Sequence, residues 1–362
     1  MASTPSPDTP TDDVRIEHGQ DLPSPATVLA ELPLSPAVKD TVVSTRHAVH
    51  DVLRGAGDRL VVVVGPCSIH DPAAAMEYAA RLKAEADALR QDLVVIMRVY
   101  FEKPRTTVGW KGLINDPRLN ESFDIPAGLR AARGILLRVN SLGLPAATEF
   151  LDLISPQYIA DLVAWGAIGA RTTESPSHRQ LASGLSCPIG FKNGTDGNIQ
   201  IAVDAIKAAA ARHHFIGISK TGQVAVLRTS GNEDCHVILR GGKTPNYSAT
   251  AVRAVCDDLA RSGLRQQVMI DASHANSGKI AARQIDVTHS IAAQVAAGDT
   301  SVIGVMLESN LIEGRQDLKP GVPLTYGQSV TDACLGWDAT VPLLHELAAA
   351  VRARRIVEAR ED

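Results

Sequence analysis

From residue 60 onward, the pattern of apolar and polar positions alternates between short strand-like runs and longer helical segments. The first run, Val61–Val64, consists of four β-branched residues and ends at Gly65 and Pro66. An apolar run without alternation is typical of a parallel strand buried on both faces, and Gly and Pro end it. By the same criteria further strands are expected at 93–100, 145–150, 167–173, 188–193, 236–242, 267–273 and 301–309.

Helical periodicity predicts a helix between successive strands and one before the first. The expected helices span 36–53, 71–89, 127–142, 155–165, 177–185, 198–212, 248–262, 286–297 and 332–355, with Asp332 opening the last. Two alternating runs around Thr221 and Gly222 predict a β-hairpin at about 214–228. Eight strands that alternate with helices predict an α/β fold, a (β/α)8 TIM barrel with an N-terminal extension and an inserted hairpin.

Composition limits the domain organisation and the class of partner. Pro, Ser and Thr are concentrated at the N-terminus, which predicts a disordered arm over 1–11. The expected organisation of the rest is an N-terminal regulatory extension over 12–58 and the barrel over 59–362. The net charge of −4 offers no basic field for nucleic acid, and no apolar run approaches the length of a membrane span. Five scattered cysteines argue against a disulfide framework and favour a reducing compartment, the cytoplasm.

The predicted strand ends carry residues of two chemical kinds. In a parallel barrel these ends meet at one mouth. One thiol, one imidazole and two carboxylates form a mixed ligand set suited to Mn²⁺, Fe²⁺, Co²⁺ or Zn²⁺: Cys67, His274, Glu308 and Asp332. The cationic set, which suits substrates with several negative charges, consists of Arg98, Lys103, Arg105, Arg171, Lys192 and Arg240.

Each of these residues also has an ordinary structural interpretation. A single buried cysteine is usually a small core hydrophobe, and single carboxylates more often cap helices or form salt bridges than bind metal. His274 alone would be a satisfied polar residue, and Arg98 or Lys192 alone could be solvated. The functional interpretation is favoured because these residues fall together at the predicted rim, Asp332 at the start of the last helix and the others at strand ends.

Seven motifs closely resemble the type I 3-deoxy-D-arabino-heptulosonate 7-phosphate (DAHP) synthases. The resemblance runs from about Asp12 to the last helix, and no rim position departs from it. The motifs are GPCSIHDP (65–72), MRVYFEKPRTTVGWKG (97–112), GARTTES (169–175), GFKNGTDG (190–197), ILRGGK (238–243), DASHANS (271–277) and TDACLGW (331–337).

The resemblance implies a metal-dependent transferase, 3-deoxy-7-phosphoheptulonate synthase. Such enzymes condense phosphoenolpyruvate with erythrose 4-phosphate and water, releasing phosphate, in the first step of the shikimate pathway. It implies the same metal ligands, Cys67, His274, Glu308 and Asp332. Phosphoenolpyruvate would lie among Arg98, Lys103, Arg171, Lys192 and Arg240, and the sugar phosphate on Arg105 and Thr106. Lys103 would protonate the aldehyde oxygen, Glu149 would position or deprotonate water, and His274 belongs to the catalytic group.

The chain also resembles the feedback-regulated branch of the family, which implies a second site for an aromatic amino acid and a homodimer or homotetramer. The residues implied for this site are Asp12, Asp13, Pro156, Gln157, Leu181, Leu185, Ser186, Phe215, Gly217 and Leu227. Asp12 or Asp13 would meet the effector's ammonium. Phenylalanine-inhibited members tend to have Ser where this chain has Gly217, so tyrosine is the expected effector; alternatively, Gly217 is only a strand glycine.

Two other functions are weighed against this one. The related 3-deoxy-octulosonate 8-phosphate synthase uses a five-carbon sugar phosphate, and the KPRT segment at 103–106 argues against it. A non-catalytic regulatory or binding protein of this fold should have lost a metal ligand or a rim cation, and none is missing.

Overall fold

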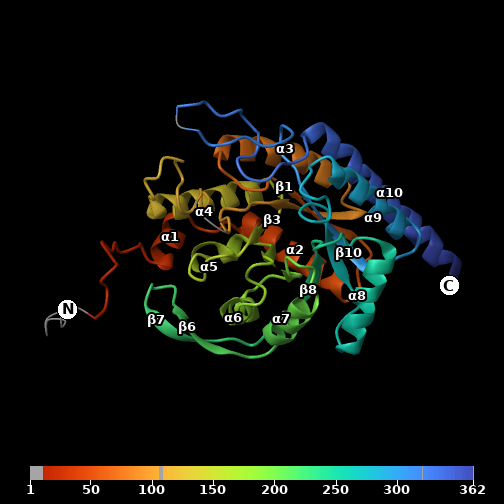
Figure 1. The fold of residues 1–362 in the computed structure, drawn as a ribbon, viewed down its shortest axis with the longest axis horizontal. Coiled ribbons are helices and arrows are strands. Elements are labelled where there is room, and N and C mark those ends of the chain that lie inside the picture. Colours follow the sequence, from red (N-terminus) through yellow and green to blue (C-terminus); the bar gives the residue numbers. More distant parts are fainter. Residues whose placement is uncertain (1–10, 106–108, 320, 362) are drawn as a thin grey trace, which may run out of the picture.

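The computed structural model describes residues 11–105, 109–319 and 321–361, and its centre is a closed barrel of eight parallel strands (Figure 1). Around the barrel the order is β1-β10-β9-β8-β5-β4-β3-β2. The predicted TIM barrel is therefore confirmed. Its strands are β1 (Leu60–Gly65), β2 (Leu93–Arg98), β3 (Ala146–Glu149), β4 (Trp165–Ile168), β5 (Ile189–Lys192), β8 (Cys235–Leu239), β9 (Val268–Asp271) and β10 (Val302–Glu308).

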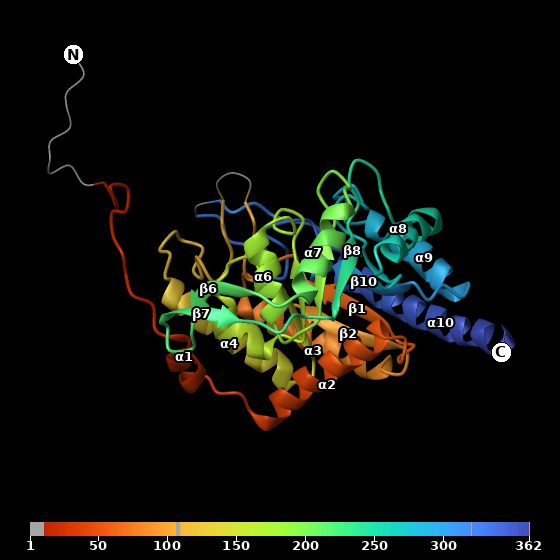
Figure 2. The same cartoon turned by 90° about the horizontal axis from the view of Figure 1, so that it is seen from below.

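Helices cover the outside of the barrel, as Figures 1 and 2 show. Several begin with Ser or Asp as N-cap and Pro in the first turn, which satisfies free N–H groups at the helix start. They are α3 (Pro72–Ala88), α4 (Ile125–Ser141), α5 (Pro156–Ile159), α6 (Pro176–Gly184), α7 (Gln200–Ala210), α8 (Ala249–Arg261), α9 (Arg283–Ala296) and α10 (Trp337–Glu361).

The barrel interior is a packed core that is closed at its amino-terminal end. Side chains alternate along each strand, so Val61 and Val63 belong to an inner cluster, whereas Val62 packs with the surrounding layer. The helix α2 (Pro36–Leu53) adds Val49, Val52 and Leu53 to the inner cluster. Because α2 packs against that end, the rim at the carboxyl ends of the strands is the open mouth of the barrel.

The fourth strand begins earlier than the sequence predicts. In place of the expected helix over 155–165 the chain forms the short helix α5 and a 3₁₀ turn, η1 (Ala160–Leu162). Trp165 is then the first residue of β4. The indole of Trp165 is fully buried and donates to Nε2 of His236 at 3.3 Å, so burial of this large ring decides the boundary. The expected strand over 167–173 therefore ends at Ile168, and Arg171 lies exposed on a turn.

The last helix begins five residues later than expected, so Asp332 does not open it. Residues 332–335 are held in an extended loop by bridges from Ser309 to Leu335 and from Gly314 to Cys334. The helix α10 starts only at Trp337 and runs to Glu361. Pairing with the β10 loop outweighs the helix-capping tendency of Asp332.

The inserted hairpin is present and lies beside the N-terminal segment. Its strands are β6 (His214–Ile218) and β7 (Val224–Arg228), and a short helix, α1 (Pro25–Glu31), which the apolar pattern did not predict, lies next to it in both views (Figures 1 and 2). Ala26 N donates to Lys220 O at 2.6 Å. Residues 1–10 of the predicted arm lie outside the described residues. In the part of the chain that is described, no helix is long and apolar enough to span a membrane.

Candidate active site

Five barrel strands end on an ionisable residue, and all five side chains are buried. They are Arg98, Glu149, Lys192, Asp271 and Glu308, at the carboxyl ends of β2, β3, β5, β9 and β10. Strands of this kind are mainly apolar along their length, and their carboxyl ends carry the groups that face ligands. Charge is thus concentrated at the open end of the barrel.

Three potential metal ligands come together at this rim. One donor atom from each of Cys67, Glu308 and Asp332 lies within 4.8 Å of the others, and Cys67 Sγ is 3.7 Å from Asp332 Oδ2. Cys67 reaches this position because β1 ends at Gly65, which has a φ of 151°. A Cβ at Gly65 would lie 3.0 Å from the carbonyl oxygen of Arg98, so only glycine allows this approach.

The fourth predicted ligand, His274, lies at the edge of this group. Its Nε2 is 4.0 Å from Glu308 Oε1, and its Nδ1 lies 2.8 Å from Asp271 Oδ2. The backbone of His274 has a φ of 53°, an uncommon conformation for a residue with a side chain. A carboxylate at Nδ1 leaves Nε2 as the nitrogen that faces the other potential ligands.

Asp271 joins the two kinds of rim residue, and the sequence reasoning did not single it out. Its carboxylate is fully buried and also pairs with Lys192 Nζ at 2.9 Å. Burial acts to raise the pKa of Asp271, but His274 and Lys192 hold it well below its ordinary value. Asp271 could have been selected from the sequence, because it ends β9 just as Glu149 and Glu308 end their strands.

Charge at the rim favours an ionised Glu308 and a protonated thiol. Burial acts to raise the pKa of Glu308, but His274, Arg98 and Lys103 lower it to about 2. Burial, with Glu308 nearby, raises the pKa of Cys67 to about 11. Lys103 Nζ donates to Cys67 Sγ at 3.0 Å and to its carbonyl oxygen at 3.2 Å. The charge of Lys103 alone does not offset the effect of burial on the thiol, so a bound metal ion would be needed to hold the thiolate at neutral pH.

The chemistry of the donor set fits a borderline divalent ion. A thiolate excludes a preference for Mg²⁺ or Ca²⁺, and carboxylates with an imidazole complete a set that Mn²⁺, Fe²⁺, Co²⁺ or Zn²⁺ accepts. Ser273 Oγ donates to Glu308 Oε2 at 2.9 Å and Arg98 donates to Glu308 Oε1 at 3.0 Å, so this carboxylate is held in place from both sides.

The cationic residues are arranged at different depths around the same rim. Arg98 is fully buried, and its guanidinium lies 3.9 Å from the centre of the Tyr100 ring. Arg240 is also buried; burial lowers its pKa, and the positive charge of Arg171 contributes to the shift. Arg105 lies further out, exposed, with its Nε donating to Trp110 O at 2.8 Å. Thr106 lies outside the described residues.

The carboxylate of Glu149 lies next to Gly169 at the mouth of the barrel. A Cβ at Gly169 would lie 2.3 Å from Glu149 Oε1, so the absence of a side chain there provides the space for this carboxylate. Glu102, which the sequence reasoning did not select, accepts a hydrogen bond from Ser155 Oγ at 3.0 Å. Burial, with Asp152 nearby, raises the pKa of Glu102 to about 7.

Most residues expected at the second site lie away from the rim, on elements that contact one another. Lys220, in the hairpin turn, donates to Gln157 O in α5 at 2.5 Å, and Thr229 after β7 hydrogen-bonds Ser183 of α6 at 2.7 Å. Leu181, Leu185 and Ser186 lie in α6 or just after it, Pro156 begins α5, and Phe215, Gly217 and Leu227 share the half-buried hairpin face. Asp12 and Asp13 lie in a bend near the start of the described chain, and both are exposed.

Comparison with known proteins identifies the family. The model of the DAHP synthetase I family matches residues 36–345. The chain is 58% identical over 344 residues to "Phospho-2-dehydro-3-deoxyheptonate aldolase, Phe-sensitive" of Escherichia coli (strain K12), covering 95% of this chain and 98% of that protein. It is 54% identical over 344 residues to the "Trp-sensitive" protein of Enterobacter agglomerans, covering 95% and 99%.

A solved structure agrees with this assignment. The phospho-2-dehydro-3-deoxyheptonate aldolase from Francisella tularensis SCHU S4 superimposes with a TM-score of 0.92 at 50% identity, covering 94% of this chain and 99% of that chain. Fold, rim residues and sequence all lead to the same assignment, and the chain belongs to the DAHP synthetase I family.

Proposed function

We propose that this protein is a 3-deoxy-7-phosphoheptulonate synthase, which condenses phosphoenolpyruvate with erythrose 4-phosphate and water to give DAHP and phosphate. The observation that carries the proposal is the meeting of Cys67, Glu308 and Asp332 beside a buried cationic rim. Relatives above half identity over nearly the whole chain are named for this activity. The free, buried state of all five cysteines supports a reducing location, the cytoplasm.

The proposed metal ligands are Cys67, His274, Glu308 and Asp332. When bound, a divalent ion would supply Lewis-acid polarisation of the aldehyde carbonyl. Among the chain's own groups, Arg98, Lys192 and Arg240, together with the exposed Arg171, hold phosphoenolpyruvate, and Arg105 and Thr106 hold the sugar phosphate. The cations keep the two anions close enough for C3 of phosphoenolpyruvate to meet the aldehyde carbon, which is an orientation effect.

Proton transfer is assigned to residues at the mouth. Burial acts to lower the pKa of Lys103, but neighbouring Cys67 and Glu308 raise it above its ordinary value, so Lys103 carries the proton that the aldehyde oxygen needs. Glu149, in the space left by Gly169, positions or deprotonates the water that adds to C2. Loss of phosphate then completes the reaction.

The test is phosphate release from purified protein. Release should require both substrates, stop with a chelator and return with Mn²⁺ or Co²⁺. Cys67→Ser should abolish it at limiting metal, because a hard hydroxyl replaces a soft thiolate, whereas Cys256→Ser in α8 should not. A preference for a five-carbon sugar phosphate would instead identify the related octulosonate enzyme, and binding of phosphoenolpyruvate without turnover would identify a binding protein.

We also propose feedback inhibition by tyrosine at a site between the hairpin, α5 and α6, with 12–58 as a regulatory extension. Relatives named Phe-sensitive and Trp-sensitive support an aromatic effector. The choice of tyrosine rests on Gly217, where a Cβ would lie 2.6 Å from Leu227 Cδ1. Serine there would push Leu227 into the site and remove space for a phenolic hydroxyl.

An inhibition series with the three aromatic amino acids tests the effector. Tyrosine should inhibit the wild type best, and Gly217→Ser should shift the preference toward phenylalanine by about tenfold, since steric exclusion or one unpaired buried hydroxyl costs about 1–3 kcal/mol. Inhibition of the wild type by phenylalanine alone, or by none of the three, would contradict the proposal.

The proposed oligomer is a homodimer or homotetramer that uses the outer face of the hairpin. Ile216 and Val226, a cross-strand pair, are 81% and 72% exposed, and Val224 beside them is 77% exposed. A contiguous apolar strand face is typical of an interface. Ile216→Lys with Val226→Lys should lower the mass in sedimentation equilibrium, whereas Ile356→Lys on α10 should not.

A further inference from the structure

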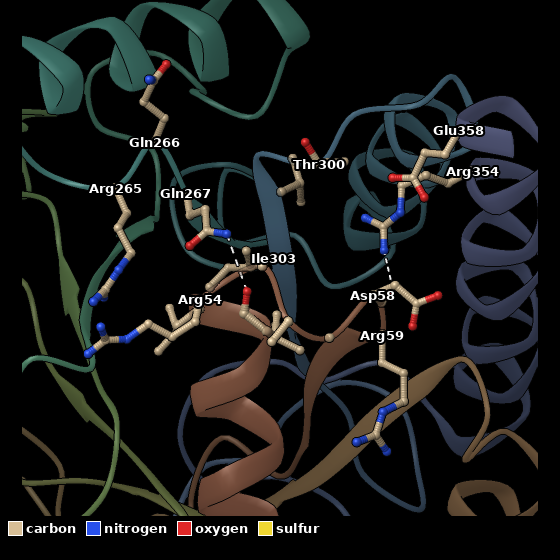
Figure 3. A pocket seen from close by; sticks show the side chains of 16 residues that line it. Arg54, Asp58, Arg59, Arg265, Gln266, Gln267, Thr300, Ile303, Arg354 and Glu358 are labelled. Carbon is tan, nitrogen blue, oxygen red and sulfur yellow. Dashed lines mark hydrogen bonds between the residues drawn. The ribbon is translucent and has the colours of Figure 1, made fainter. Parts of the chain in front are cut away.

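A cavity of about 660 Å³ lies at the amino-terminal end of the barrel, opposite the mouth. Its walls come from the loop between α2 and β1, the residues before β9, the residues before β10 and the last turns of α10 (Figure 3). Val52 and Leu53 of α2 line it and also belong to the inner core cluster. The packed barrel interior therefore separates this cavity from the rim.

The cavity has an excess of positive charge. Arg54, Arg59, Arg265 and Arg354 line it, with Asp58 and Glu358 as the acidic members. The carboxylate of Asp58 pairs with Arg355, which does not line the cavity, so it is already neutralised. Arg54 pairs with Glu233 at 2.8 Å. This leaves three lining arginines against one lining carboxylate, Glu358.

In the described part of the chain, these three arginines hydrogen-bond only to main-chain oxygens. Arg59 donates to Arg90 O at 3.4 Å and Arg265 donates to Glu233 O at 2.9 Å. Arg354 is 5% exposed; it donates to Asp58 O and, at 3.3 Å, to Asp299 O, while its Nε is buried without a partner. Burial lowers the pKa of Arg354. The negative charges of Glu358 and Asp58 oppose this shift, but no carboxylate among the described residues hydrogen-bonds to the guanidinium. A buried guanidinium with an unpartnered N–H is costly, and a bound anion would compensate it.

The charges are divided between the two sides of an apolar floor. In the view of Figure 3, Arg54 and Arg265 lie on one side of Ile303, and Arg59 and Arg354 lie on the other. Val302 and Ile303 are buried at the start of β10 and form part of the floor, and Thr300 also lines the cavity. Guanidinium groups at both ends match carboxylate or phosphate groups bidentately.

We propose that this cavity binds a small dianion whose two acidic groups are separated by an apolar spacer, such as a ring dicarboxylate. The volume lies within the range of small-molecule sites. One acidic group would pair with Arg265 and the other with Arg59 and Arg354, and the spacer would cover Val302 and Ile303. The site is distinct from the rim and from the hairpin region, so it adds a third ligand position.

The experiment is a calorimetric titration of the full chain at low ionic strength, with phosphoenolpyruvate present to occupy the rim. The probes are terephthalate, which has two carboxylates across a ring, benzoate, which has one, and inorganic phosphate. Terephthalate should bind at one site per chain and at least tenfold more tightly than benzoate or phosphate. The Arg59→Gln, Arg265→Gln double variant should weaken it at least tenfold, whereas Arg138→Gln, an exposed arginine on α4, should not change it.

Arg59 and Arg265 are chosen because neither is fully buried, so their replacement leaves the core intact. Thermal unfolding of the double variant within a few degrees of the wild type verifies this. Failure of all three probes to saturate the protein overturns the proposal. Equal affinity for benzoate and terephthalate refutes the two-ended site, and terephthalate binding that the double variant leaves unchanged places the ligand elsewhere.

Discussion

Replacing Asp271 by Asn removes the negative charge that pairs with Lys192 and lies beside His274. Asp271 Oδ2 is 2.9 Å from Lys192 Nζ and 2.8 Å from His274 Nδ1, and Asp271 is fully buried. Removing one partner of a buried ion pair costs about 3–5 kcal/mol, because the other charge stays buried without compensation. With an unfolding entropy of about 2.1 cal/mol/K per residue, a loss of 3 kcal/mol lowers the Tm of a 362-residue chain by about 4 °C.

The same variant should weaken metal binding. Asp271 holds His274 through Nδ1, and loss of such a partner typically lowers metal affinity 10- to 100-fold. Competition with a chromogenic chelator measures the metal Kd, and differential scanning calorimetry of the metal-free protein measures the Tm. Both quantities should change together in Asp271→Asn.

Asp161→Asn is the matched control, because Asp161 pairs with the buried Arg133 at 2.7 Å away from the rim. It should lose stability but bind metal as the wild type does. Wild-type metal affinity in Asp271→Asn, or an equal loss of affinity in Asp161→Asn, would refute the assigned role of Asp271.

Three further predictions concern single groups. Arg105→Ala should raise the KM for erythrose 4-phosphate at least tenfold and that for phosphoenolpyruvate little, because Arg105 lies far out on its loop; steady-state kinetics with equal effects on both would contradict this. Air oxidation of metal-free protein should join Cys67 to Cys334, whose Sγ is 3.4 Å from the backbone N of Cys67, and peptide mapping that finds both thiols free would exclude it. Burial lowers the pKa of His236 to about 4, so the unfolded state binds more protons between pH 4 and 6.5, and up to about 3 kcal/mol of stability should be lost as the pH falls through this window. Chemical denaturation at pH 4 and at pH 6.5 should show a smaller loss of stability for His236→Gln than for the wild type. An equal loss in the two proteins would assign the effect to other groups.

The barrel was predictable because its strands are buried on both faces. Runs such as Val61–Val64 contain no polar residue and are therefore easily identified as buried strands. The ends of such strands place Arg98, Lys192 and Glu308 at the rim. The boundary at Trp165 was not predictable, because only the packed interior shows that this ring fills the barrel and bonds His236. The prediction that Asp332 opens the last helix was wrong for a similar reason. The loop that carries Asp332 is fixed by pairing with residues after β10, and no local pattern shows this pairing.

The candidate site was predictable in composition but not in its internal contacts. Residue type and strand order indicate that Cys67 and Glu308 share a rim, but only the structure shows that Asp271 holds both Lys192 and His274. The cavity at the opposite end illustrates the same limit. Its arginines come from segments far apart in the sequence, and no local pattern connects them.

The hydrogen bond from Ser155 to Glu102 has a consequence for how two sites would communicate. Glu102 directly precedes Lys103 of the rim, and Ser155 directly precedes Pro156 of the proposed effector site. An effector that displaces α5 would pull on this bond and shift the loop that carries Lys103 and Arg105. Coupling free energy is reciprocal, so the factor by which the effector weakens substrate binding equals the factor by which substrate weakens effector binding. A cell rich in substrate would then need more effector to reach the same inhibition.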